Sequence, residues 1–91
     1  MNFDITNTDW AEIENLTDDT TYMLQAKTVS DSWYYKNYAT TNILLTQADT
    51  LPTDNKTGIL ASDIKFKKVS GLNIYIKAIN VPTNIDIQEV Q

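Results

Sequence analysis

The chain of 91 residues contains no cysteine and no histidine. Catalysis by a Ser-His or Cys-His nucleophile is therefore excluded, and so are the ordinary zinc sites, which need thiolate or imidazole ligands. Disulfide bonds, a common means of stabilising a small domain, are impossible as well. The site chemistry that remains is that of paired carboxylates, of a serine–lysine pair or of a calcium ion.

Arginine is also absent, so that seven lysines face twelve acidic residues and the formal charge is −5. Arginine is the side chain that binds phosphate and guanine through two parallel hydrogen bonds, and an acidic protein repels the phosphate backbone. The composition therefore predicts that the protein has no nucleic acid partner.

Long apolar runs are missing too. No segment approaches the roughly 18 apolar residues that a membrane-spanning helix needs. Residues Met1 to Trp10 include acids and amides where a signal peptide would have a basic start and an apolar run. We therefore expect a soluble product of cytoplasmic synthesis with no membrane partner.

The residues that are present favour β-structure. The hydrophobic fraction of 42% is drawn largely from Ile, Val, Leu, Tyr and Trp, and Thr, Asn and Asp favour strands or turns over helix interiors. A chain this short buries only about 60 to 68% of its unfolded surface. Because its core will be thin, and because it has no Cys or His for a disulfide or metal site, oligomerisation is the remaining common remedy.

Apolar and polar residues alternate with period two, most clearly over residues 72–78, which is typical of a half-buried strand. Segment 42–47 has three apolar residues in a row, which indicates a strand buried on both faces or one end of a bulge. Other strand-like segments lie at residues 10–16, 21–27, 64–67 and 85–88, with turn signals at 17–20, 30–32, 48–58, 70–71 and 81–84. No window shows the stripe of an amphipathic helix.

Short strands at regular spacing predict a single all-β domain over residues 1–91. We expect an antiparallel β-sandwich or jelly-roll-like barrel of about six to eight short strands, with little or no helix. Residues 1–9 are expected to form a flexible or partner-docking N-terminal arm.

Two pairs of residues look like fragments of catalytic sites. Glu12 and Glu14 share one face of a strand, as glycosidase acids can, but they flank Ile13, and a solvated face opposite a buried isoleucine explains them. Lys68 and Ser70 have the spacing of a serine–lysine pair, but Ser70 lies in a Ser-Gly turn, where serine is favoured conformationally. We predict no catalytic residue and no enzymatic activity.

Neither a metal nor a cofactor is predicted. The acids that a calcium ion would need are scattered over turns without a calcium-binding loop: Asp18, Asp19, Asp31, Asp49 and Asp54. Lys65 and Lys67 alternate with apolar residues, so we expect them to face water, where lysine also discourages aggregation between strand edges.

An aromatic run is the most informative surface candidate. Four large rings lie within residues 33–38, and a strand of period two buries only half of such a run. The rings are Trp33, Tyr34, Tyr35 and Tyr38. Three alternatives stay open: all four pack within the monomer, some form a subunit or partner interface, or some stack on sugar rings.

The order of several short motifs resembles small β proteins encoded among bacteriophage structural genes, over about residues 10 to 90. The motifs are Trp10-x-x-Ile13-x-x-Leu16, Thr21-Tyr22-x-Leu24-Gln25, an apolar strand leading to Pro52 and Gly58-Ile59-Leu60, Phe66, and Gly71-Leu72-Asn73-Ile74-Tyr75-Ile76-Lys77-Ala78. One departure is the pair Asp18-Asp19, which stands where a glycine is expected in the first hairpin.

This resemblance implies a virion component made in the cytoplasm of a bacterial host: a capsid decoration or head-fibre protein, or a small piece of tail or baseplate. Such proteins are often trimers that attach to the capsid or other virion proteins. We therefore expect a homotrimer, with Pro52 and the four rings at the contact. The alternative is a carbohydrate-binding adhesion module in which the same rings stack on host surface glycans.

Overall fold

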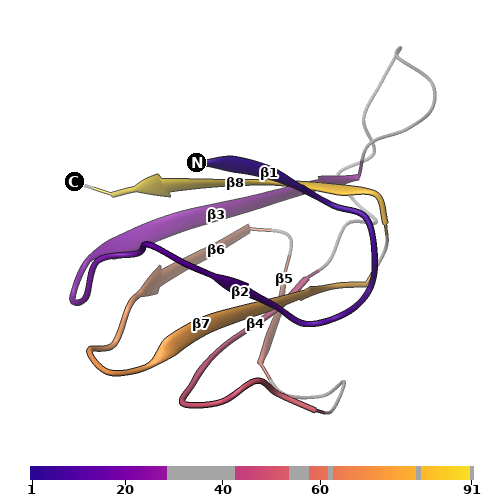
Figure 1. The fold of residues 1–91 in the computed structure, drawn as a ribbon. Coiled ribbons are helices and arrows are strands. Elements are labelled where there is room, and N and C mark those ends of the chain that lie inside the picture. The colour runs from indigo at the N-terminus through magenta and orange to yellow at the C-terminus, as the bar shows by residue number, and fades with distance from the viewer. Residues whose placement is uncertain (29–42, 54–57, 62, 80, 91) are drawn as a thin grey trace.

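The structure is a computed structural model that describes residues 1–28, 43–53, 58–61, 63–79 and 81–90. These residues form two facing antiparallel sheets of four strands each, without a helix, as Figure 1 shows. The first sheet has the order β1 (Asn2–Ile5), β8 (Thr83–Glu89), β3 (Thr21–Thr28), β6 (Asp63–Lys67). The second has the order β2 (Ala11–Ile13), β7 (Asn73–Ala78), β4 (Ile43–Ala48), β5 (Ile59–Ala61). The predicted all-β sandwich is confirmed.

The chain changes sheets at almost every connection. Only β4 and β5 are consecutive strands that pair with each other. The connections from β1 to β2 and from β5 to β6 join edge strands of opposite sheets. One lateral side of the sandwich is therefore made by β1 and β2, and the other by β5 and β6. We call them the β1/β2 side and the β5/β6 side.

The two tight turns expected as hairpins are in fact crossings between the sheets. Residues 14–20 lead from β2 to β3, and residues 68–72 lead from β6 to β7. Asp19 takes a left-handed conformation with φ of 59°, which an aspartate tolerates because its short side chain can bond locally. The prediction of a hairpin at Asp18-Asp19 was wrong because alternation shows where strands are and not which sheet they join.

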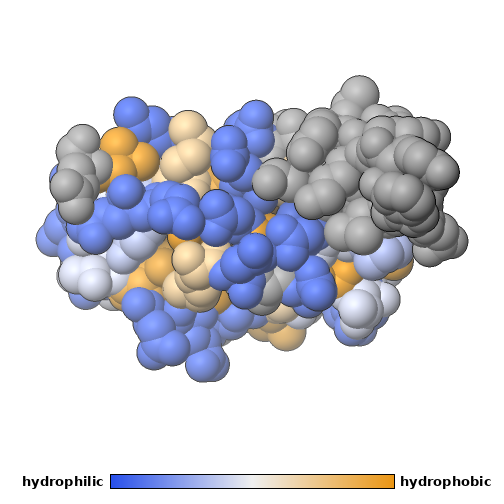
Figure 2. Space-filling model, turned by 90° about the horizontal axis from the view of Figure 1, so that it is seen from above, coloured by the Kyte–Doolittle hydropathy of each residue, from blue (hydrophilic) through white to orange (hydrophobic). Residues whose placement is uncertain are grey.

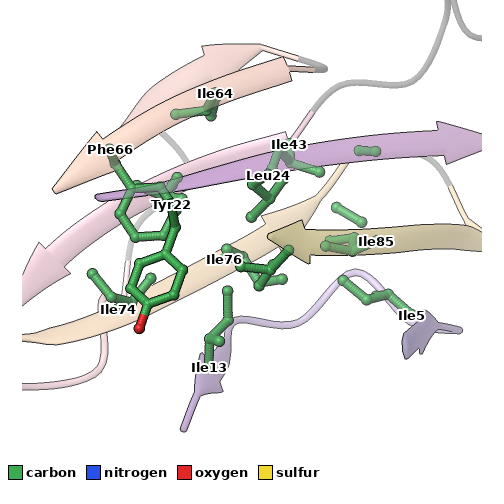
Figure 3. Packing of buried hydrophobic residues seen from close by; sticks show 14 residues of the cluster. Ile5, Ile13, Tyr22, Leu24, Ile43, Ile64, Phe66, Ile74, Ile76 and Ile85 are labelled. Atoms are coloured by element: carbon green, nitrogen blue, oxygen red, sulfur yellow. The ribbon is translucent and has the colours of Figure 1, made fainter. Parts of the chain in front are cut away.

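The core lies between the sheets and is built by the period-two pattern. In β6, Ile64 and Phe66 are buried while Asp63, Lys65 and Lys67 are exposed. Figure 3 shows side chains of both sheets meeting in this layer, with Ile5 and Ile13 at one edge and Ile64 and Phe66 at the other. The cluster comprises Ile5, Ile13, Tyr22, Leu24, Ala26, Ile43, Leu45, Ile64, Phe66, Ile74, Ile76, Ala78, Ile85 and Ile87.

The second sheet is also buried in places on its outer face. Leu44 alternates with Ile43 and Leu45, which belong to the core, yet only 6% of it is exposed. The pairing of β4 with β7 runs from Ile43 to Ala48 without an extra residue. Of the two alternatives for segment 42–47, burial on both faces is therefore confirmed, and no bulge interrupts β4.

Residues 2–5, which belong to the expected N-terminal arm, form a strand. β1 pairs with β8 from Asn2 opposite Asp86 to Ile5 opposite Thr83, and the amide of Ile87 donates to the carbonyl of Met1 at 2.8 Å. Ile5 is only 8% exposed. Residues 2–5 are therefore not a flexible arm. They complete the first sheet, because Ile5 is buried there.

The outer face of the first sheet is polar. Figure 2 views this face from above, and hydrophilic side chains cover most of its described part. Asn84 donates to Asp4 at 2.8 Å and Gln88 donates to Asp86 at 3.0 Å. In the described part of the chain, no helix has the length and hydrophobicity to span a membrane.

Candidate interaction surfaces

The aromatic run lies outside the described residues, so the placement of Trp33, Tyr34, Tyr35 and Tyr38 stays a prediction. Its attachment points are described. Segment 29–42 follows Thr28, which pairs with Thr83, and precedes Ile43, which pairs with Ala78. The segment is therefore anchored at the end of the sandwich where β7 passes into β8.

That end of the sandwich also carries exposed apolar side chains. Ile79 is 44% exposed and Val81 is 38% exposed, and both lie in the connection between β7 and β8. A short connection with two large apolar residues in water is unusual enough to suggest a contact surface. We call Ile79 and Val81, together with the attachment points Thr28 and Ile43, the β7–β8 end.

Pro52, the fifth predicted contact residue, is attached elsewhere. It is half-buried and lies in the connection that leaves β4 after Ala48, next to Leu51, which is 54% exposed. Since segment 29–42 joins the other end of β4, the attachment points of the two predicted contact segments lie at opposite ends of that strand. The structure does not bring these attachment points together.

The carboxylate pair Glu12 and Glu14 borders a shallow recess. It has a volume of about 260 Å³ and is lined by Met1, Glu12, Ile13, Glu14 and Asn15. Both glutamates are exposed, whereas only 5% of Ile13 is exposed, which confirms a solvated face opposite a buried isoleucine.

The Lys68 and Ser70 pair is held by a third residue, Asp18. One carboxylate oxygen of Asp18 accepts a hydrogen bond from Lys68 Nζ, and the other accepts from Ser70 Oγ at 3.4 Å. The backbone adds two bonds, from Asp19 N to Lys68 O at 2.8 Å and from Lys68 N to Thr20 O at 3.0 Å. Lys68 Nζ and Ser70 Oγ therefore both bond to the carboxylate of Asp18.

The cluster has a structural consequence instead. It joins the connection between β2 and β3 to the connection between β6 and β7, two crossings that are separated by about half the chain. The sequence analysis missed it because Asp18 and Ser70 each look like ordinary turn residues. Nothing in the local pattern shows that turns 50 residues apart meet.

We predict that replacing Asp18 with asparagine makes the protein less stable at neutral pH. The hydrogen bond from Lys68 holds the pKa of Asp18 below its usual value of 3.8. A lowered pKa stabilises the fold above pH 3.8, and this contribution disappears as the pH falls through the folded-state pKa. The Asp18→Asn variant should therefore melt below the wild type at pH 7 and coincide with it near pH 2, when both are followed by circular dichroism.

The matched control for this prediction is Asp49→Asn. Asp49 is an exposed turn residue with no ion pair to a described residue. Its variant should follow the wild type at every pH. If Asp18→Asn shows the same melting temperature as the wild type at pH 7, the bridge makes no net contribution.

Gln47 provides a second polar link near the same turn. Its amide nitrogen donates to Lys67 O at 2.9 Å, and its oxygen accepts from Val69 N at 2.7 Å. Gln47 belongs to β4, Lys67 is the last residue of β6, and Val69 lies in the connection that follows β6. The two bonds therefore join the second sheet to the end of the edge strand of the first sheet. Lys65 and Lys67 are exposed as expected.

No three potential metal ligands gather within the described residues. In comparisons with known proteins, no family model, no curated protein and no solved structure matches this chain. The candidate surfaces are therefore the β7–β8 end, the recess beside Glu12 and Glu14, and the lysines of β6.

Proposed function

We propose that this protein is a structural accessory component of a bacteriophage particle that binds the capsid or other virion subunits as a homo-oligomer, in keeping with a homotrimer. The observation that carries the proposal is the β7–β8 end, where Ile79 and Val81 are exposed beside the attachment points of the segment with four aromatic rings. Aromatic residues are enriched at protein interfaces, and the buried centre of an interface is more apolar than the rest of the surface.

The size of the domain supports the same proposal. Its core is a single layer between two small sheets, and a domain of this length without disulfides is often marginal alone. Contact with further subunits would bury the exposed side chains of Ile79 and Val81. An oligomer bound to a lattice therefore fits both the thin core and the exposed side chains.

We expect the purified protein to be an oligomer that sediments with phage capsids. The combined variant Ile79→Ser, Val81→Ser should lower the mass found by light scattering or weaken capsid binding by about tenfold or more, since apolar anchors at the centre of an interface dominate its affinity. Replacing Val69 with serine is the control and should change neither measurement, because Val69 is 48% exposed and lies in the connection between β6 and β7, at the other end of β7.

Two results separate this proposal from its competitor. A protein that stays monomeric at roughly 50 µM and also fails to bind capsids contradicts the virion role. The competing function is a carbohydrate-binding adhesion module, favoured by the number of rings in residues 33–38. Binding to host polysaccharide that is lost in Trp33→Ala, with no capsid binding, would establish that alternative.

A further inference from the structure

The two lateral sides of the sandwich carry opposite charge. On the β1/β2 side the charged side chains of β1, of β2 and of the residues directly around them are acidic: Asp4, Asp9, Glu12 and Glu14. Two positive groups also reach this side, Lys77 of β7, which donates to the carbonyl of Thr8, and the Met1 ammonium group, which donates to the carbonyl of Ile87. On the β5/β6 side, β5 has no charged residue, and β6 presents Lys65 and Lys67 against the single acid Asp63. The next lysine, Lys68, is already bonded to Asp18.

The charges on both sides are available to a partner. Glu12, Glu14, Lys65 and Lys67 are exposed, and none of them forms an ion pair with another described residue. They also lie on opposite sides of the molecule, because the core separates β2 from β6, as Ile13 and Phe66 show in Figure 3. Among the described residues, these charges therefore do not neutralise one another within one copy.

The recess on the β1/β2 side has the chemistry of a lysine site. Glu12 and Glu14 supply two carboxylates, while Met1 and Ile13 supply apolar surface. A lysine side chain packs its methylene groups on apolar surface and keeps its ammonium group near charge or water. At about 260 Å³, the recess is smaller than the roughly 300 to 1,000 Å³ typical of small-molecule pockets and suits a side chain.

We propose that the β1/β2 side of one copy binds β6 of a second copy, with Lys65 and Lys67 of β6 facing Glu12 and Glu14. The contact deepens the proposed function, on which it rests, by naming the surfaces that join the subunits. The carbonyl of Lys67 at the end of β6 already accepts a hydrogen bond from Gln47, so the proposed contact is assigned to the side chains of β6.

The charges also select the geometry of the contact. Two β6 strands repel each other through their lysines, and two β1/β2 sides repel each other through their acids, so only unlike sides can meet. A contact between unlike surfaces is heterologous, and it repeats until it closes a ring or continues as a fibre. Closure after three copies would give the expected trimer.

Charge reversal on one side at a time tests this contact. The variant Glu12→Lys, Glu14→Lys has two basic sides, and the variant Lys65→Glu, Lys67→Glu has two acidic sides. Each alone should bind itself at least about tenfold more weakly than the wild type in light scattering at low salt. An equimolar mixture should associate again, because each variant then offers the side that the other lacks.

A control separates the contact from net charge. The variant Asp49→Lys, Glu89→Lys changes the formal charge from −5 to −1, as Glu12→Lys, Glu14→Lys does, because each replacement adds two charges. Asp49 and Glu89 are exposed and belong to none of the strands β1, β2, β5 and β6, so this variant should associate like the wild type. Circular dichroism checks that all three variants fold.

Three outcomes overturn the inference. The first is a wild type that is monomeric at roughly 50 µM and low salt, the second is a pair of reversal variants that keep the wild-type mass when measured singly, and the third is a mixture that does not associate. The second outcome leaves the assembly role intact, because the oligomer then exists through other surfaces. Failure of the assembly role is recognised separately, by the absence of capsid binding.

Discussion

Replacing Gly58 with alanine is expected to lower the free energy of unfolding by about 3 kcal/mol or more. Gly58 has φ of +113°, a conformation that side chains with a Cβ rarely adopt, and a Cβ built there would lie 2.6 Å from the carbonyl oxygen of Leu45. The neighbouring atom belongs to the backbone of β4, so it cannot move aside as a flexible side chain would. The collision is removed only if β5 moves away from β4. β5 begins at Ile59, which lies opposite Leu45.

The matched control is Gly71→Ala, in the connection between β6 and β7. Gly71 also has a positive φ, of +85°, but a Cβ there meets no atom within 4 Å. Its variant carries the conformational strain without the collision, so we expect a loss of about 1 kcal/mol. Urea denaturation followed by tryptophan fluorescence measures both losses. Equal losses of unfolding free energy for the two variants would show that the backbone around Leu45 accommodates the new Cβ at position 58 without a further loss of stability.

The alternation of side chains predicted most of the fold because each central strand has one face in the core. β7 lies inside a segment that the sequence assigned to a strand, and β3 extends one residue beyond its segment. β8 begins two residues before its segment, in residues that were predicted as a turn. β1 and β5 were missed for a physical reason. Both are edge strands of four and three residues, and so short a segment shows too few alternations to outweigh the turn residues around it.

The connections between the sheets were beyond local patterns. After Ile13 and after Lys67 the chain could continue in the same sheet or cross to the other. The outcome depends on how all the strands pair and pack in the core. The same limit applies to the surfaces. Glu12 and Glu14 at β2 and the lysines of β6 are visible in the sequence, but only the strand order shows that β2 and β6 lie on opposite sides of one sandwich.

Ile76→Ala is expected to be the most destabilising truncation of a single core side chain, with a loss of about 3 to 4 kcal/mol. Ile76 is fully buried and lies in the central part of the cluster in Figure 3. It pairs with Ala11 on one neighbouring strand and Leu45 on the other, so the backbone on both sides is fixed and cannot close over the cavity. The substitution removes three carbons of the Ile76 side chain, and with them its packing contacts with both sheets.

The exposed isoleucine three residues further on provides the comparison. Ile79 is 44% exposed, so Ile79→Ala should change the free energy of unfolding of the monomer by less than about 0.5 kcal/mol. With a total stability of about 5 to 15 kcal/mol for a domain, the loss at Ile76 is large enough to populate the unfolded chain on mild heating. Denaturation at low protein concentration isolates this effect from association. Similar losses at Ile76 and Ile79 would mean that the core can collapse around position 76, which two paired neighbours should prevent.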